Sequence, residues 1–417
     1  MHVCYVTHRY PPQSGGVETH VEQLATRLLA RGHDVTVVAA DARETDAHDP
    51  EERPASRDDG DTTGRDDGDT TRRDNEHTTR DDGVEVHRVS AFAPGGNVYA
   101  APGIVPAVWR VVRGVDSAVG ARPPPDVVHV HNYHAVPFVL GGLTAWLATD
   151  ARLVVTPHYH AGSDDASRDK LLTLYRPFGA ATLARADRVI AVSDWERRQL
   201  EASFGVDATV VPNGVVRERF DGAAGSDQGD AAAGESRPYL LTVGRLEQYK
   251  GVQHVISALP ELPAYDLRVA GSGAYGEQLR EHAAETGVSD RVEFLGYVDD
   301  DQLPGLYANA AAHVTLSTHE AYGMTVAESL AAGTPVVVRE AGALVDWTTT
   351  TGVVGLDDPS PSVVADAVRR AVGGPSPDPT AVPTWETVTD ELLAVYTGRS
   401  DAGVSGAVSR YTVGHKC

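Results

Sequence analysis

Apolar residues occur along the chain in short continuous runs that alternate with amphipathic segments of helical period. The first run covers residues 2–8, and a glycine turn and an amphipathic segment separate it from the next run at 34–40. Short apolar runs joined by helices are typical of parallel strands that are buried on both faces. The pattern therefore predicts an α/β protein whose parallel sheets are covered by helices.

The alternation occurs in two series that a polar stretch separates. Residues 221–238 are rich in glycine, alanine and aspartate, which is a composition typical of linkers. A chain of 417 residues is also too long for one ordinary domain. We therefore expect an N-terminal domain at 1–220, the linker at 221–238, a C-terminal domain at 239–384, a closing helix at 385–398 and a tail at 399–417.

One polar segment interrupts the first series. Residues 41–82 contain 16 acidic residues and 7 arginines, a net charge of −9, and the sequence RDDGDTT occurs there at 57–63 and again at 65–71. Apolar residues are almost absent, so the segment has little surface to bury on folding. We expect a disordered acidic insertion between two strands.

The whole chain is strongly acidic. Its formal net charge is −23, and only three lysines occur in it. An acidic, lysine-poor surface suits concentrated salt, in which self-repulsion is screened, so a halophilic source is a hypothesis from composition. The same charge argues against a nucleic acid partner. Two cysteines, and a start of the chain without a basic leader, favour a cytoplasmic protein.

The charge is distributed unevenly between the two series. Residues 83–218 hold 13 basic and 13 acidic residues, whereas residues 219–417 hold 13 basic and 27 acidic ones. The first domain would therefore tolerate an anionic partner, such as a membrane surface or a phospholipid-linked acceptor; alternatively, its arginines pair with local acids. The uncharged stretch at 127–149 contains histidines, a proline and glycines, which indicates a buried strand and a core helix rather than a membrane span.

The stretch HEAYGMTVAE carries the most specific chemical signal. Glu320 would lie on a loop after a strand, and Glu328 about two turns further on, inside the helix that this loop opens. The amides of Gly323, Met324 and Thr325 would lie at the N-terminus of that helix, where anions bind. Two carboxylates on either side of an anion-binding turn suit a ligand with a central diphosphate and hydroxyl groups at both ends. A nucleotide sugar is such a ligand.

Two further segments offer candidate phosphate contacts. In TVGRLEQYKG, Arg245 and Lys250 follow a strand and suit a diphosphate leaving group, unless Arg245 only pairs with Glu247 at the surface. In YPPQSGGVET, Gly15 and Gly16 let a ligand approach the backbone beside a helix N-terminus, although a tight strand–helix turn also explains them.

Histidines and a glycine-rich loop allow other interpretations. His131 and His158 end strands of the first domain, and His158 can donate a hydrogen bond to a sugar hydroxyl. Zinc is not expected, because neither a cysteine nor a carboxylate at helical spacing accompanies them. The sequence GSGAYG matches a dinucleotide fingerprint, but it follows a later strand than such sites do. Gly271 is therefore interpreted as part of a loop beside the phosphates or the base of the donor.

Taken together, these segments resemble glycosyltransferase family 4, whose members have the GT-B fold. The resemblance covers nearly the whole chain apart from 41–82 and the tail, and its most specific feature is the Glu-x7-Glu spacing together with Arg245 and Lys250. It implies two Rossmann-like domains that face each other across a cleft, a nucleoside-diphosphate sugar as donor, transfer with retention of anomeric configuration, and no metal or other cofactor.

The resemblance also implies roles for single residues. The diphosphate would be held by Arg245 and Lys250, the ribose by Glu328 and the transferred sugar by Glu320. The predicted catalytic residues are Glu320, His158, Arg245 and Lys250, and the predicted donor-binding residues are Gly15, Gly16, Arg245, Lys250, Gly271, Tyr297, Gly323, Met324, Thr325 and Glu328. The acceptor would be a glycan, a glycolipid or a lipid-linked oligosaccharide for the cell surface, bound mainly by the N-terminal domain at the inner face of the cell membrane.

Other functions stay open at this point. A nucleotide-sugar epimerase or a phosphorylase shares the GT-B fold, the GSGAYG loop leaves an NAD-dependent oxidoreductase as an alternative, and a binding protein without catalysis is a third. Two segments also depart from the family pattern. Residues 342–352 lack its acidic and glycine-rich character, and residues 41–82 have no counterpart in it.

Overall fold

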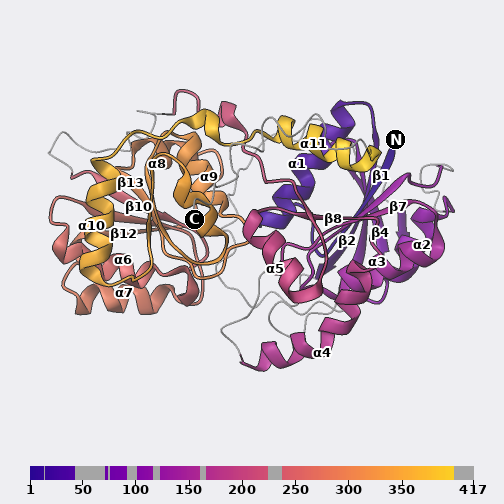
Figure 1. Cartoon of the computed structure of the whole chain (residues 1–417), viewed down its shortest axis with the longest axis horizontal. Coiled ribbons are helices and arrows are strands. Elements are labelled where there is room, and N and C mark those ends of the chain that lie inside the picture. Colours follow the sequence, from indigo (N-terminus) through magenta and orange to yellow (C-terminus); the bar gives the residue numbers. More distant parts are fainter. Residues whose placement is uncertain are drawn as a thin grey trace, which may run out of the picture.

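The chain forms two α/β lobes, which lie side by side in Figure 1, the N-terminal one in indigo and magenta and most of the C-terminal one in orange. The predicted class of two Rossmann-like domains is confirmed. The structure is a computed structural model, and it describes residues 1–13, 15–42, 71–73, 76–91, 101–115, 123–159, 166–223 and 237–398.

The N-terminal sheet has the strand order β3-β4-β5-β2-β1-β6-β7-β8-β9, parallel except at β3 and β4. Alternate residues of β1 enter two separate apolar clusters, one on each face, which explains its continuous apolar sequence. The strands are β1 His2–Thr7, β2 Asp34–Ala42, β3 Thr71–Arg73, β4 Glu76–Asp81, β5 Val84–Ala91, β6 Val127–His131, β7 Arg152–Thr156, β8 Arg188–Ala191 and β9 Thr209–Val210. The helices are α1 Gly16–Ala30, α2 Ile104–Val112, α3 Val136–Ala148, α4 Ala166–Leu183, α5 Asp194–Phe204 and the 3-10 helix η2 Arg217–Arg219.

The C-terminal sheet has six parallel strands in the order β12-β11-β10-β13-β14-β15. Its strands are β10 Tyr239–Val243, β11 Asp266–Ala270, β12 Val292–Gly296, β13 Ala312–Thr315, β14 Val336–Arg339 and β15 Val353–Leu356. Its helices are α6 Val252–Ala258, α7 Gly276–Glu285, α8 Leu303–Asn309, α9 Met324–Ala331 and α10 Pro361–Val372. Its 3-10 helices are η3 Gln248–Lys250, η4 Leu259–Glu261, η5 Ser289–Arg291, η6 Gly342–Thr349 and η7 Pro379–Ala381.

The expectation that residues 41–82 form a disordered insertion is wrong at both ends of this segment. β2 continues to Ala42, and β4 pairs antiparallel with β5. Thr78 of β4 is buried, and its hydroxyl lies 3.3 Å from Nδ1 of His87 on β5. Hydrogen bonding between strands thus orders a polar sequence that has little apolar surface to bury. Residues 43–70 and 74–75 lie outside the described part of the chain.

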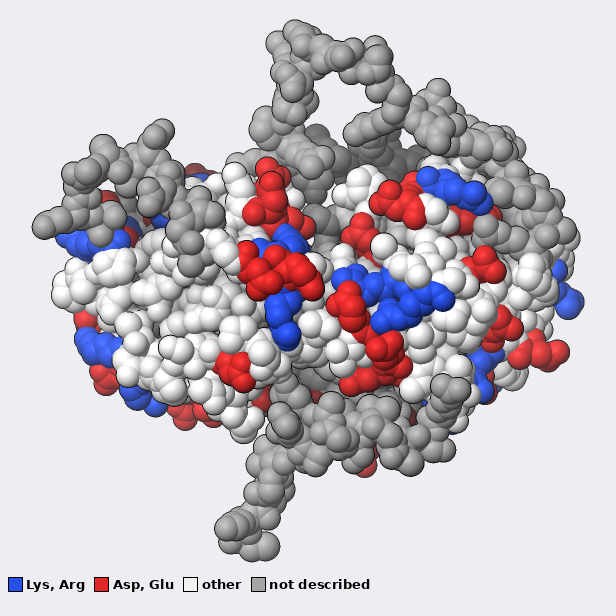
Figure 2. Space-filling model, turned by 90° about the horizontal axis from the view of Figure 1, so that it is seen from above, with Lys and Arg blue, Asp and Glu red and all other residues white. Residues whose placement is uncertain are grey.

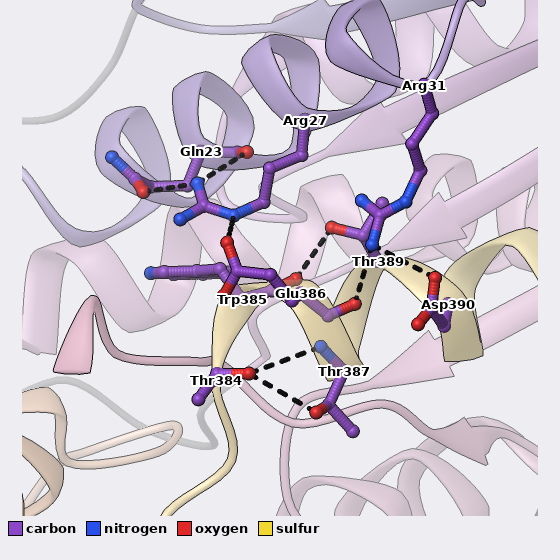
Figure 3. A network of polar contacts seen from close by, with 9 residues as sticks. All are labelled: Gln23, Arg27, Arg31, Thr384, Trp385, Glu386, Thr387, Thr389 and Asp390. Carbon is purple, nitrogen blue, oxygen red and sulfur yellow. Dashed lines mark hydrogen bonds and ion pairs between the residues drawn. The ribbon is translucent and has the colours of Figure 1, made fainter. Parts of the chain in front are cut away.

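The closing helix, α11 (Trp385–Thr397), packs on the N-terminal domain although it follows the C-terminal one. Its apolar side shares a buried cluster with β1 and α1. Figure 3 shows the polar contacts along the two helices, in which Arg27 pairs with Glu386 at 2.7 Å and Arg31 with Asp390 at 3.0 Å. The last helix is therefore part of the first domain's core.

The described surface mixes charges of both signs. Figure 2, which views the molecule from the top of Figure 1, shows basic and acidic side chains next to one another. Within the described residues, no helix is both long and apolar enough to cross a membrane.

Candidate active site

Two loops at the carboxyl edge of the C-terminal sheet bring a lysine and a glutamate together. β10 leads into η3, which carries Lys250, and β13 leads into the loop that carries Glu320. Both loops leave the same edge, because β10 and β13 are parallel neighbours. The Nζ atom of Lys250 lies 2.7 Å from Oε1 of Glu320, and both side chains are partly exposed. Two of the predicted catalytic residues thus form an ion pair that a ligand can reach.

Arg245 and Tyr249 lie beside this pair. The guanidinium of Arg245 donates to the hydroxyl of Tyr249 at 3.4 Å, and Nζ of Lys250 lies 5.3 Å from the centre of the Tyr249 ring. Among the described residues, Arg245 and Glu247 form no ion pair, so the surface-pair alternative is not supported. Burial opposes the charge of Lys250, but the attraction of Glu320 and Tyr249 outweighs it and raises the pKa of Lys250. The site therefore presents two cations.

The predicted helix N-terminus lies next to Glu320. α9 begins at Met324 after Gly323, whose φ of 95° lies in the left-handed region that favours glycine. A Cβ atom at Gly323 would also lie 2.9 Å from the side chain of Leu344. The first N–H groups of a helix have no partner within it, so the amides around Met324 and Thr325 are suited to an anion.

Glu328 lies one turn further along α9 and is half-buried. Its Oε2 accepts a hydrogen bond from the hydroxyl of Tyr307 at 2.9 Å. Burial raises the pKa of Glu328 to about 7, and the hydrogen bond from Tyr307 and the charge of Arg219 only partly offset this. The carboxyl group therefore titrates near neutral pH. Tyr307 was not predicted, because it lies on another helix 21 positions away.

The GSGAYG loop lies directly against the loop of Arg245. A Cβ atom at Gly271 would lie 1.9 Å from the carbonyl oxygen of Gly244, so only glycine fits at this contact. The amide of Gly271 donates to the carbonyl of Gly296 at 2.7 Å, and the next residue, Tyr297, is 55% exposed. The glycines of this sequence thus serve a close approach of two loops. That both residues contact the donor stays a prediction.

In the N-terminal domain, a carboxylate lies at the predicted glycine turn. Glu18 of α1 is buried, and its carboxylate accepts hydrogen bonds from its own amide and that of Val17. Its Oε1 lies 3.3 Å from Nε2 of His8. A Cβ atom at Gly15 would lie 2.4 Å from Oε2 of Glu18, whereas one at Gly16 would meet open space. Gly15 thus makes room for Glu18, and phosphate contacts at both glycines stay a prediction.

His158 lies two residues beyond the end of β7, and the rings of His20 and His131 lie against it. Its φ of 48° is strained for a residue other than glycine, and such strain often marks a functional position. Its Nε2 lies 3.4 Å from Nδ1 of His131, and the ring of His20 stacks edge-on against it with 5.0 Å between ring centres. Burial lowers the pKa of all three, to about 4 for His20, so the rings are neutral near pH 7.

A buried carboxylate holds the segment that follows His158. Glu196 at the start of α5 accepts hydrogen bonds from the amides of Tyr159 and Val192, at 2.5 and 2.7 Å. Burial raises its pKa to about 8, while these amides partly offset the effect. Sequence reasoning missed Glu196, since no local motif distinguishes it from a first-turn acid of any helix.

The segment at 342–352, which departs from the family pattern, contacts the N-terminal domain. Asp346 of η6 accepts a hydrogen bond from the amide of Trp195 at 2.6 Å and pairs with Arg198 at 2.7 Å. The hydroxyl of Ser193 donates to the carbonyl of Ala321, next to Glu320, at 2.7 Å. The loop of Glu320 is thus tied to helix α5 of the other domain.

Comparison with known proteins agrees with this arrangement. The model described as "Glycosyltransferase Family 4" matches residues 14–219, and "Glycosyl transferases group 1" matches residues 226–375. The phosphatidyl-myo-inositol mannosyltransferase of Mycolicibacterium smegmatis is 30% identical over 313 residues, which cover 68% of this chain and 75% of that protein. The chain belongs to glycosyltransferase family 4.

Two further similarities extend over most of this family 4 chain. The glycogen synthase of Mycobacterium tuberculosis is 29% identical over 376 residues, which cover 82% of this chain and 79% of that protein. The crystal structure of Anabaena Alr3699/HepE in complex with UDP superposes with a TM-score of 0.63 at 18% identity, over 96% of this chain and 95% of that one. The chain is therefore a glycosyltransferase with the GT-B fold.

Proposed function

We propose that this glycosyltransferase moves a sugar from a nucleoside-diphosphate sugar to a glycan, glycolipid or lipid-linked acceptor with retention of anomeric configuration. The observation that carries the proposal is the pair of Lys250 and Glu320 beside Arg245 and the N-terminus of α9. Cations and helix amides lie together where a diphosphate needs them. A carboxylate lies within reach of the same point and suits sugar hydroxyls.

The residues at the carboxyl edge of the C-terminal sheet bind different parts of the donor. Arg245 and Lys250 stabilise the negative charge that develops as the nucleoside diphosphate departs. When the diphosphate shares the charge of Lys250, Glu320 accepts hydrogen bonds from the transferred sugar. Glu328 accepts hydrogen bonds from the ribose hydroxyls, and Tyr297 lies beside the base. His158 donates to the sugar from the other domain.

Retention follows from a front-face reaction. A double displacement needs a carboxylate that attacks the anomeric carbon, whereas Glu320 is here assigned to the hydroxyl groups of the transferred sugar. We therefore assign one step in which the acceptor oxygen bonds to that carbon as its bond to the diphosphate oxygen breaks. The acceptor proton passes to the departing phosphate oxygen. Because Arg245 and Lys250 neutralise the leaving group, this step needs no metal.

Exposed apolar side chains on three neighbouring helices of the N-terminal domain support a lipid-linked acceptor. Trp109, Trp146, Leu147 and Phe178 are exposed, Leu147 to 75%, on α2, α3 and α4, which pack in this order. The guanidinium of Arg185 lies 4.6 Å from the ring of Trp146. Aromatic rings next to arginine suit the interface of an anionic membrane. The enzyme is thus proposed to act at the inner face of the cell membrane.

The reaction is tested by release of nucleoside diphosphate from UDP-, GDP- and ADP-sugars, with soluble glucan or phosphatidylinositol vesicles as acceptor. We expect turnover with one donor and a product whose anomeric configuration, read by NMR, equals that of the donor. An inverted product would overturn the front-face step. No turnover with any donor would count against the transfer itself.

Membrane contact has a separate test. The double variant Trp146→Glu, Leu147→Glu should sediment with anionic phosphatidylglycerol vesicles at least about tenfold more weakly than the unaltered protein. Val372→Glu, at an exposed apolar position of the C-terminal domain, is the matched control. Equal sedimentation of all three proteins would contradict the membrane assignment.

A further inference from the structure

Three buried histidine rings meet at the carboxyl edge of the N-terminal sheet. His20 comes from α1, His131 ends β6 and His158 follows β7. One ring nitrogen of each lies within 4.8 Å of the others. The ring centres are 5.0 to 5.6 Å apart, so the three rings surround one point.

Hydrogen bonds leave nitrogens of this cluster uncommitted. Nδ1 of His20 lies 2.7 Å from Oδ1 of Asn213, and a ring that donates there presents a bare Nε2. Nε2 of His131 is fully buried and has no hydrogen-bond partner within the described structure. The neighbouring His129 differs, because hydroxyl groups lie 2.6 and 2.7 Å from its two nitrogens.

The spacing suits a tetrahedral metal ion. Zinc–nitrogen bonds of 2.0–2.1 Å place neighbouring ligand nitrogens about 3.4 Å apart. Nδ1 of His131, which is the other nitrogen of that ring, and Nε2 of His158 are separated by 3.4 Å. We propose that His20, His131 and His158 form a site for a divalent transition-metal ion of the zinc type, with three protein ligands and one open position.

The chemistry of the three groups narrows the choice of ion. Neutral imidazoles favour zinc, cobalt, nickel or copper over magnesium or calcium, which prefer oxygen ligands. Asn213 acts as a positioning residue, since its contact with Nδ1 orients His20 toward the cluster.

The consequence for catalysis rests on the proposed function. In that function, His158 donates a hydrogen bond to the transferred sugar. A metal ion bound to His158 would prevent this hydrogen bond. The ion is therefore an inhibitor of transfer and not a cofactor. Zinc at one equivalent should slow the reaction, and a chelator should restore it.

The site itself is tested with cobalt as the probe and without any donor. Chelator-treated full-length protein should bind one Co²⁺ per chain and show the visible absorption of tetrahedral cobalt, which Zn²⁺ then abolishes. His20→Gln and His131→Gln should each weaken this binding at least about tenfold, and Asn213→Ala about tenfold. His129→Gln, beside the cluster, and His254→Gln, in the other domain, should bind as the unaltered protein does. Thermal unfolding of every variant shows which of them remain folded.

Two outcomes would overturn the proposal. One is the absence of a tetrahedral cobalt spectrum in the unaltered protein, and the other is equal binding by the folded His20→Gln and His131→Gln variants. Neither depends on transfer activity. If cobalt binds as expected but no sugar nucleotide supports transfer, the metal site stands and the proposed function fails.

Discussion

The carboxyl edges of the two sheets differ in the charge of the groups that they carry. The C-terminal edge presents Arg245 and Lys250 with the paired Glu320, whereas the N-terminal edge presents the neutral rings of His131 and His158. A diphosphate needs the first kind of surface, and an uncharged sugar needs the second. The difference shows how two similar domains can divide one ligand between them, one holding its charge and the other its hydroxyl groups.

The largest effect should come from Lys250→Ala. It removes a cation from the leaving group and leaves Glu320 without its partner, so kcat/KM should fall about 10²- to 10³-fold. Steady-state kinetics with the active donor measures this loss. Arg370→Ala, at an exposed position of α10 in the same domain, should change little. A loss of similar size in that control would mean that overall charge, not this site, matters.

Gly271→Ala should destabilise the fold where the loop of Gly271 lies against the loop that carries Arg245. The new Cβ atom would lie 1.9 Å from the carbonyl oxygen of Gly244, at a φ of 134° that side chains rarely adopt. We expect a loss of about 3 kcal/mol or more in the free energy of unfolding, measured by denaturant titration. Gly287→Ala, which also has positive φ but meets open space, separates the backbone strain from the clash. Equal losses in both would contradict the close-approach role.

Glu320→Gln should separate binding of the sugar from binding of the diphosphate. The variant keeps the shape but removes the attraction that raises the pKa of Lys250. Transfer should slow about tenfold to a hundredfold, while affinity for the nucleoside diphosphate alone is kept, since Lys250 remains. Calorimetry measures the affinity for the nucleoside diphosphate, and kinetics with the full donor measures the rate of transfer. Loss of both the transfer rate and the affinity for the nucleoside diphosphate, as expected for Lys250→Ala, would argue against a sugar-binding role for Glu320.

Glu328→Gln should remove a dependence of stability on pH. The pKa is about 7 in the folded chain against an ordinary value of 4.5, so between these values the unfolded state loses the proton first. Stability therefore falls as pH rises through this window, by at most about 3 kcal/mol, and the cost is complete above pH 7. The variant should gain stability over the unaltered chain at pH 8 and much less at pH 5. Glu277→Gln, an exposed acid of α7, is the control, and an equal gain at both pH values would contradict the assignment.

The sequence could predict the charged residues at the carboxyl edge of the C-terminal sheet, because they lie close together along the chain. Arg245 and Lys250 share one loop, and Glu320 and Glu328 share one loop–helix segment, so local motifs place them. The alternation of apolar runs likewise predicts both sheets. The pairing of Lys250 with Glu320 still needed the adjacency of β10 and β13.

The neutral carboxyl edge of the N-terminal sheet, where His131 and His158 lie, was only partly predictable, because its residues come from distant parts of the chain. His20 lies on a helix more than 100 positions before His131, and no spacing rule links the two. Glu196 near this edge, and Tyr307 in the other domain, act through contacts that depend on tertiary packing. The ends of 41–82 were misjudged for the same reason, since β4 is ordered by its partner strand.

The most direct test of the account is a calorimetric titration of the full-length protein with UDP, GDP, ADP and NAD, repeated for Lys250→Ala. The account predicts that one nucleoside diphosphate binds at one site per chain, that the variant loses at least about tenfold in affinity, and that NAD does not bind. Binding of NAD through the GSGAYG loop, or diphosphate binding that survives in the variant, would contradict it.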